Sequence, residues 1–163
     1  MFKKFAIAVP MTLMALSTSM AFAADESRTS INITAEIPSS IFYAQPVNPD
    51  FGKDEKMQYL IPAGTLTDVV GMYDVKHTEG SVNAYVEGGP QPLFNGNAAK
   101  NIALTYAFNG KVLTGTSQEV VGDTESNGGM RAELRVTAAK PTADQTGLYT
   151  ATPVVIFDAV PRI

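Results

Sequence analysis

Residues 30–37 read SINITAEI, a stretch in which apolar and polar side chains alternate without a break. Strict alternation predicts an extended strand with one apolar face and one polar face. Such a strand cannot bury its apolar face alone, so it must add to a sheet in its own domain or in another molecule. The residues on the apolar face are Ile31, Ile33, Ala35 and Ile37.

The segment before this strand has the three parts of a secretory signal. Lys3 and Lys4 supply the charged start, an apolar run covers residues 5–20, and Ala21-Phe22-Ala23 fits a small-x-small cleavage site. The apolar run is short for a bilayer span. We therefore expect residues 1–23 to be a signal peptide and the mature chain to be one exported domain.

The expected mature chain is acidic. Without Lys3 and Lys4, ten basic side chains remain against sixteen acidic ones, a net charge of −6. This charge argues against nucleic acid and anionic membranes as partners. The chain has no cysteine and a single histidine, His77, which excludes thiol catalysis, cysteine–zinc sites and metal sites with several histidine ligands. We expect no cofactor and no metal.

The rest of the chain has the pattern of an all-β sandwich, and no convincing helix is predicted. Threonine, valine, glycine and proline recur, and turn signals come at short intervals. Pro38, Pro46, Pro49 and Gly52 predict a loop-rich connection after the first strand. Further strands are expected at residues 57–61, 66–75, 81–86, 133–138 and 147–160.

The clearest local element is a hairpin over residues 102–114. Apolar residues alternate up to Phe108, and Asn109-Gly110 follows at once. Asn-Gly is the preferred pair for a two-residue type I′ turn, because both central residues need positive φ. Val112 then begins the return strand.

Two other stretches carry specific expectations. Residues 122–129, GDTESNGG, are polar and glycine-rich and are expected to form a loop. The last strand, residues 147–160, contains the continuous apolar run 154–157, which suits a strand buried on both faces.

Three polar groups could carry chemistry, and each has a simpler interpretation. The segment 122–129 imitates a calcium loop, but Leu134 stands where glutamate is needed, so a solvated turn is favoured. His77 has no nucleophile motif beside it and is interpreted as an ordinary strand-end residue. Glu133 and Asp144 would form a glycosidase pair only if the fold brought them together. We predict no enzyme activity.

Three blocks of sequence, taken in order, resemble a known family. They are the alternating segment ending in I-x-A-x-I, the hairpin ending in G-K-V-L-T at 110–114, and the approach P-T-A-x-x-x-G-x-Y at 141–149. The stretch V-K-H-T at 75–78 also looks like a family strand. Over essentially the whole mature chain, the sequence resembles the major fimbrial subunits (pilins) of the alternate, class 5, colonisation-factor type of chaperone–usher pathway.

The resemblance implies an incomplete immunoglobulin-like sandwich that is completed by a donor strand from a neighbouring subunit. In such pilins a periplasmic chaperone first fills a groove beside the last strand, and at the outer-membrane usher the N-terminal strand of the next subunit replaces it. The resemblance thus implies a signal peptide at 1–23, a donor strand at 24–38 and a pilin sandwich at 39–163. The matching donor positions are Ile31, Ile33, Ala35 and Ile37. Val155 and Phe157 are expected to line the acceptor groove.

The function implied is that of a structural subunit of a surface fimbrium, exported through the periplasm, which polymerises head to tail by donor-strand exchange and supports adhesion. Its partners would be neighbouring pilin subunits, the chaperone, the usher and a tip adhesin. An alternative stays open: a self-complete secreted β-sandwich that binds a carbohydrate or protein ligand, with residues 30–37 in its own sheet.

Overall fold

The computed structural model describes residues 41–163, which lie in the second of two units, residues 36–163, into which the chain divides. The signal peptide and the donor positions predicted from the sequence lie outside the described residues. Within 41–163, no helix has the length and apolar character needed to cross a membrane.

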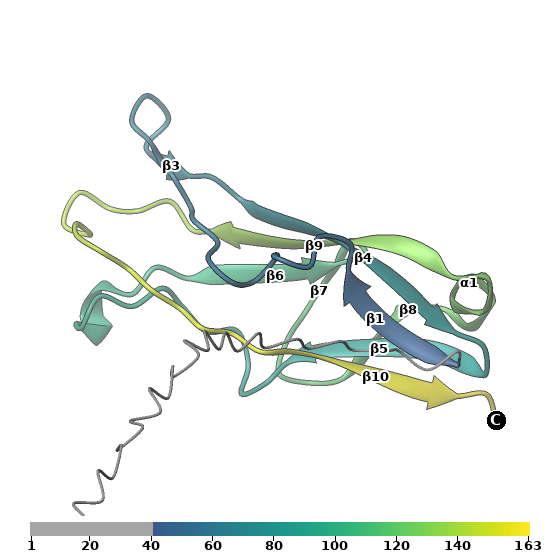
Figure 1. The fold of residues 1–163 in the computed structure, drawn as a ribbon. Coiled ribbons are helices and arrows are strands. Elements are labelled where there is room, and N and C mark those ends of the chain that lie inside the picture. The colour runs from purple at the N-terminus through teal and green to yellow at the C-terminus, as the bar shows by residue number, and fades with distance from the viewer. Residues whose placement is uncertain (1–40) are drawn as a thin grey trace, which may run out of the picture. The chain divides into compact units, whose positions relative to one another are not determined.

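The described part is nearly all β, which confirms the predicted fold class (Figure 1). One sheet has five antiparallel strands in the order β1-β4-β9-β6-β7, a second has three in the order β10-β5-β8, and β2 pairs with β3 alone. The strands are β1 (Phe42–Pro46), β2 (Tyr59–Leu60), β3 (Thr65–Leu66), β4 (Val69–His77), β5 (Gly80–Val86), β6 (Leu104–Phe108), β7 (Lys111–Val112), β8 (Gln118–Val121), β9 (Met130–Ala138) and β10 (Val155–Pro161). The short helices are η1 (Ala98–Lys100), a 3₁₀ turn, and α1 (Asp123–Gly128).

The core lies between the two larger sheets and is built mainly from alternate strand positions, as the period of a strand requires. Leu113 lies outside the strands, and Val120 and Val121 are neighbours at the register shift between β5 and β8. The ring of Phe157 on β10 packs edge-on against that of Phe108 on β6, with centroids 4.8 Å apart, and so joins the two sheets. The buried apolar residues of the core are Val75, Val82, Ala84, Val86, Leu104, Tyr106, Phe108, Leu113, Val120, Val121, Ala132 and Leu134.

The hairpin predicted around Asn109-Gly110 is confirmed. Phe108 pairs with Lys111, and the two turn residues have φ values of 49° and 76°, as a type I′ turn requires. The side-chain amide of Asn109 also donates to the carbonyl of Val120, 2.8 Å away. This contact fixes the turn against β8.

The prediction of a loop at 122–129 is wrong, because residues 123–128 form the helix α1. The acidic residues Asp123 and Glu125 lie in its first turn, where they favour the helix dipole. The hydroxyl of Ser126 is buried and donates to the carbonyl of Gly80, which anchors the helix to the start of β5. Gly129 ends the helix with a positive φ of 77°. The polar, glycine-rich composition did not indicate this helix, because its stability comes from these tertiary contacts.

The predicted loop after residue 38 also contains a strand that the prolines concealed. β1 pairs with β4 from Phe42↔His77 to Pro46↔Tyr73. Pro46 is tolerated because it is the last residue of a strand at the end of the five-stranded order.

The last strand differs from its prediction in position and in burial. β10 begins at Val155, eight residues later than expected, and runs on to Pro161. Residues 147–154 form the isolated bridge between Thr150 and Phe94, and the carbonyl of Val154 accepts a hydrogen bond from the N–H of Glu87 at 2.9 Å. Residues 155–158 are each half-buried, so the expectation of a strand buried on both faces is wrong. The apolar run 154–157 thus belongs largely to β10, which is the first strand in the order β10-β5-β8.

Candidate functional site

The residues predicted to line an acceptor groove lie on β10, at one end of the three-stranded order. Within residues 41–163, β10 pairs only with β5. Val155 lies opposite Val86, and Phe157 lies opposite Ala84. Because those partners are core residues, Val155 and Phe157 also face the interior of the sandwich. Both side chains nevertheless remain only half-buried.

The described strands follow the order of an immunoglobulin-type sandwich, with β7 added beyond β6 in one sheet and β8 added beyond β5 in the other. Such a sandwich has strands A, B, E and D in one sheet and C, F and G in the other. β1, β4, β9 and β6 occupy the positions of A, B, E and D, while β5 and β10 occupy C and F. Among the described strands, none occupies position G, which would lie beside β10.

Aromatic rings from the opposite sheet pack against Phe157 of β10. The ring of Tyr73 on β4 lies 5.5 Å from that of Phe157 and 5.8 Å from that of Phe108, measured between centroids. Burial raises the pKa of Tyr73. Sequence reasoning did not select Tyr73 or Phe108 for this site. Their alternation within strands was visible, but no sequence pattern indicates which sheet positions meet across a core.

The inward side chains of β1 mirror those of β10. Phe42 and Ala44 face the core and are only half-buried, like Val155 and Phe157. β1 and β10 therefore each stand at one end of a sheet, and residues 41–163 cover their inward apolar side chains only in part. An apolar strand is the kind of group that fits such a place, because it offers side chains to the core and hydrogen bonds to a strand edge.

The end of β10 is fixed firmly. Ala159, Val160 and Pro161 continue the ladder with β5, and the backbone N–H of Arg162 donates to the carbonyl of Glu79 at 2.7 Å. A Cβ at Gly80 would lie 2.0 Å from the carbonyl oxygen of Val160, so only glycine allows this approach. The edge strand is thus held in position over its whole length.

The polar residues considered from the sequence each have a hydrogen-bond or ion-pair partner. His77 ends β4, as predicted, and its Nδ1 donates to the carbonyl of Ser81 at 2.9 Å. Asp123 is paired with Arg162, and Glu133 with Arg135. Asp144 accepts a hydrogen bond from the hydroxyl of Thr142. Each of these carboxylates therefore has a structural partner of its own.

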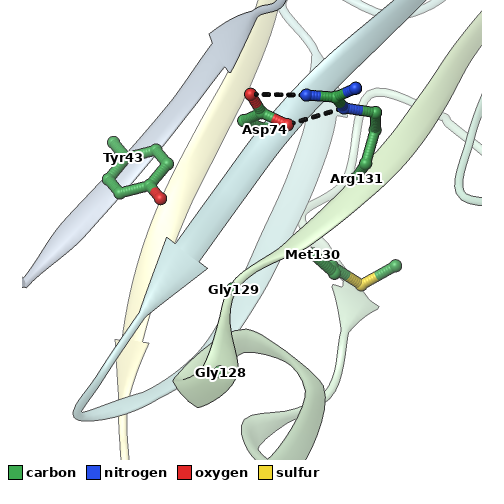
Figure 2. A pocket seen from close by; sticks show the side chains of 6 residues that line it. All are labelled: Tyr43, Asp74, Gly128, Gly129, Met130 and Arg131. Carbon is green, nitrogen blue, oxygen red and sulfur yellow. Dashed lines mark hydrogen bonds and ion pairs between the residues drawn. The ribbon is translucent and has the colours of Figure 1, made fainter.

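A shallow depression of about 400 Å³ lies on the outer face of the five-stranded sheet (Figure 2). Its central feature is the ion pair of Asp74 and Arg131, with Nε–Oδ1 2.8 Å and Nη2–Oδ2 3.1 Å. The hydrogen bonds from Arg131 hold the pKa of Asp74 below its usual range. The polar pair is neutralised internally, and among residues 41–163 no cluster of side chains suited to a metal ion is found. The lining residues are Tyr43, Asp74, Gly128, Gly129, Met130 and Arg131.

Comparison with known proteins gives one family and one fold. The family model described as "CS1 type fimbrial major subunit" matches residues 27–158. The structure titled "Structure of the CooA pilin subunit from enterotoxigenic Escherichia coli" is similar, with a TM-score of 0.50 and 13% sequence identity, over 73% of this chain and 99% of that chain. At this identity the likeness shows the fold alone. No curated protein matches the chain.

Proposed function

The chain belongs to the CS1 type fimbrial major subunit family, and on that premise we propose that it polymerises head to tail by donor-strand exchange. In this proposal an N-terminal strand of one subunit completes the sandwich of the next. The observation that supports it most is the place of β10. This strand takes position F of an immunoglobulin-type sandwich, and position G beside it is taken by none of the strands in 41–163.

The donor is the alternating segment predicted from the sequence. A strand beside β10 would need apolar side chains at every second position to reach Val155 and Phe157 and the rings of Tyr73 and Phe108 behind them. Its other side chains would face solvent, where polar residues are favoured. The segment 30–37 meets this requirement, with Ile31, Ile33, Ala35 and Ile37 as the inserted side chains.

The energy of such a joint is substantial. Burying one isoleucine contributes about 1.5–3 kcal/mol, so three contribute roughly 5–9 kcal/mol before the cost of ordering the strand. Backbone hydrogen bonds along β10 add to this and remove an edge that could otherwise aggregate. Because the donor would be part of the core, its release would require partial unfolding of the acceptor, so the joint would be kinetically durable.

Each subunit would carry one donor strand and one acceptor groove, a heterologous arrangement that builds an open filament. Residues 1–23 would direct export, 24–38 would be the donor segment and 39–163 the sandwich. A periplasmic chaperone would protect the groove before an outer-membrane usher and a tip adhesin join the assembly. The finished fimbrium lies at the cell surface, and its subunit needs no catalysis.

The test replaces one inserted side chain and one side chain on the opposite face of the donor strand. Ile33→Asp would place a carboxylate in an apolar groove, which costs several kcal/mol, whereas Asn32→Asp places the same charge in solvent. We expect Ile33→Asp to be exported without forming fimbriae, while Asn32→Asp forms them normally, as seen by electron microscopy. Fimbriae of normal length from Ile33→Asp would refute donor-strand exchange.

A further inference from the structure

An exposed apolar surface lies at the tip of the β2–β3 hairpin. Three consecutive side chains are exposed there: Tyr59 by 54%, Leu60 by 43% and Ile61 by 83%. Figure 1 shows this hairpin projecting beyond the two main sheets. We refer to these three residues as the hairpin tip. Side chains of this kind on a projecting element mark an interaction surface.

The hairpin tip is held in one shape by hydrogen bonds below it. The N–H groups of Ala63 and Gly64 both donate to the carbonyl of Leu60, at 3.1 and 2.8 Å. At the base, Thr67 N–H donates to the carbonyl of Gln58 at 2.9 Å, and Gln58 N–H donates to the hydroxyl of Thr67 at 2.8 Å. An apolar tip that is already ordered loses little conformational entropy on binding.

A second exposed apolar cluster lies on the outer face of the five-stranded sheet. Val70 and Met72 occupy the same face of β4, and Val47 N–H donates to the carbonyl of Met72 at 2.8 Å. We refer to Val47, Val70 and Met72 as the sheet strip; each is more than two-fifths exposed. Arg135 on β9 is bound to both Glu133 and Asp68, so these three neighbouring side chains together carry one negative charge. The strip therefore offers an apolar surface with little net charge around it.

We propose that the hairpin tip of one subunit docks on the sheet strip of a second copy in the same fimbrium. The two clusters differ in shape, a projecting tip and a flat strip, so their contact is heterologous and can repeat along a filament. A fimbrium holds copies of the subunit at high effective concentration, and a contact too small to form a dimer in solution becomes effective there. This inference rests on the fimbrial family and on no particular mechanism of joining the subunits.

The first test measures whether assembly covers the hairpin tip. The chain has no cysteine, so a single introduced thiol can be labelled cleanly with a maleimide. Ile61→Cys carries the probe, and Glu87→Cys, at an exposed position after β5, is the matched control. In purified intact fimbriae we expect the Ile61→Cys thiol to react about ten-fold or more slowly than the control, because it reacts only when the contact opens. Equal rates would overturn the proposal. Leu60→Cys provides the same measurement if Ile61→Cys fimbriae do not form.

The second test identifies the surface that covers the tip. Fimbriae that carry both Ile61→Cys and Met72→Cys are oxidised and then separated on a denaturing gel without reductant. We expect a ladder of covalently joined subunits in the double variant and none in either single variant. Slow labelling of Ile61→Cys without a ladder would overturn the strip as the docking surface. Both readouts use assembled fimbriae, so they are distinct from the Ile33→Asp test, which asks whether subunits join at all.

Discussion

Arg162 and Asp123 form a two-point ion pair that ties the C-terminal end of β10 to the start of α1. The Nε–Oδ2 distance is 2.7 Å and the Nη2–Oδ1 distance is 2.6 Å. The family model matches the chain only to residue 158, so Arg162 lies in a tail outside the matched region, whereas Asp123 lies inside it. It holds the edge strand in place at the end where the ladder with β5 finishes.

Loss of this ion pair should lower stability in a pH-dependent way. The hydrogen bonds from Arg162 hold the pKa of Asp123 below its usual range. A lowered folded-state pKa stabilises the protein above the unfolded pKa of about 4, and this contribution is lost as the pH falls through the folded value. We expect Arg162→Ala to melt slightly below the parent at pH 7, with the difference vanishing in acid. Thermal melts from pH 7 to pH 2 measure this.

Asp123→Asn and the double variant are the controls for that measurement. Both single variants lose the same charged pair, and Asp123→Asn also loses the favourable interaction of Asp123 with the helix dipole, so the double variant should melt close to Asp123→Asn. Both side chains are substantially exposed, which keeps the expected effect small. A difference between parent and Arg162→Ala that persists unchanged at the lowest pH would contradict the assignment to Asp123.

Tyr106 should make the protein sensitive to alkali. Its hydroxyl donates to the carbonyl of Gln91 at 2.8 Å, and burial raises the pKa of Tyr106 to about 12. A raised folded-state pKa gives stability that is present below the unfolded pKa of about 10 and is lost as the pH rises through the folded value. We expect the free energy of unfolding to decrease as the pH rises from about 10 to about 12. In Tyr106→Phe this decrease should be less steep. Urea unfolding at a series of alkaline pH values tests this, and identical slopes would contradict it.

Gly71 is required where β4 passes beneath Phe51. A Cβ at this glycine would lie 2.5 Å from Cζ of the Phe51 ring, which also packs edge-on against Tyr73. We expect Gly71→Val to cost about 1–3 kcal/mol, since it forces the ring away from the core. Gly128→Ala is the control, because a Cβ there meets nothing within 4 Å. Urea unfolding of the purified subunits compares them, and equal stability of the two variants would show that Phe51 does not need this space.

Local sequence signals predicted the local structure well. Asn109-Gly110 predicted the turn, and the strand expected at residues 81–86 is β5, with Val82, Ala84 and Val86 on its buried face. Both signals act between neighbours in the chain, so one sequence is enough to read them.

Features that depend on distant contacts were missed. The helix α1 owes its place to the contact of Ser126 with Gly80, and β1 exists because β4 offers it a partner in spite of Pro46. The apolar run of β10 predicted burial on both faces, whereas its place at the end of a sheet order is set by topology. Val155 and Phe157, selected from the sequence, do face the interior. Their neighbours Tyr73 and Phe108 come from other strands, and the sequence does not show that these residues meet.

The central claim is that the sandwich needs a strand beside β10 and that residues 30–37 can supply it. Thermal unfolding of two matched proteins tests it directly: the mature chain without residues 24–37, and the same protein with Ser27–Pro38 joined after Ile163 through a short flexible linker. A third protein, with Ile33→Asp in the joined segment, is the control. A hairpin connection would lay the joined strand antiparallel to β10.

We predict that the shortened protein is unstable or aggregates, while the protein with the joined strand is a monomer that melts cooperatively at a clearly higher temperature. The Ile33→Asp control should lose most of that gain. A shortened protein that is already stable and monomeric, and that gains nothing from the joined strand, would show that the sandwich is complete without a donor and would contradict the account.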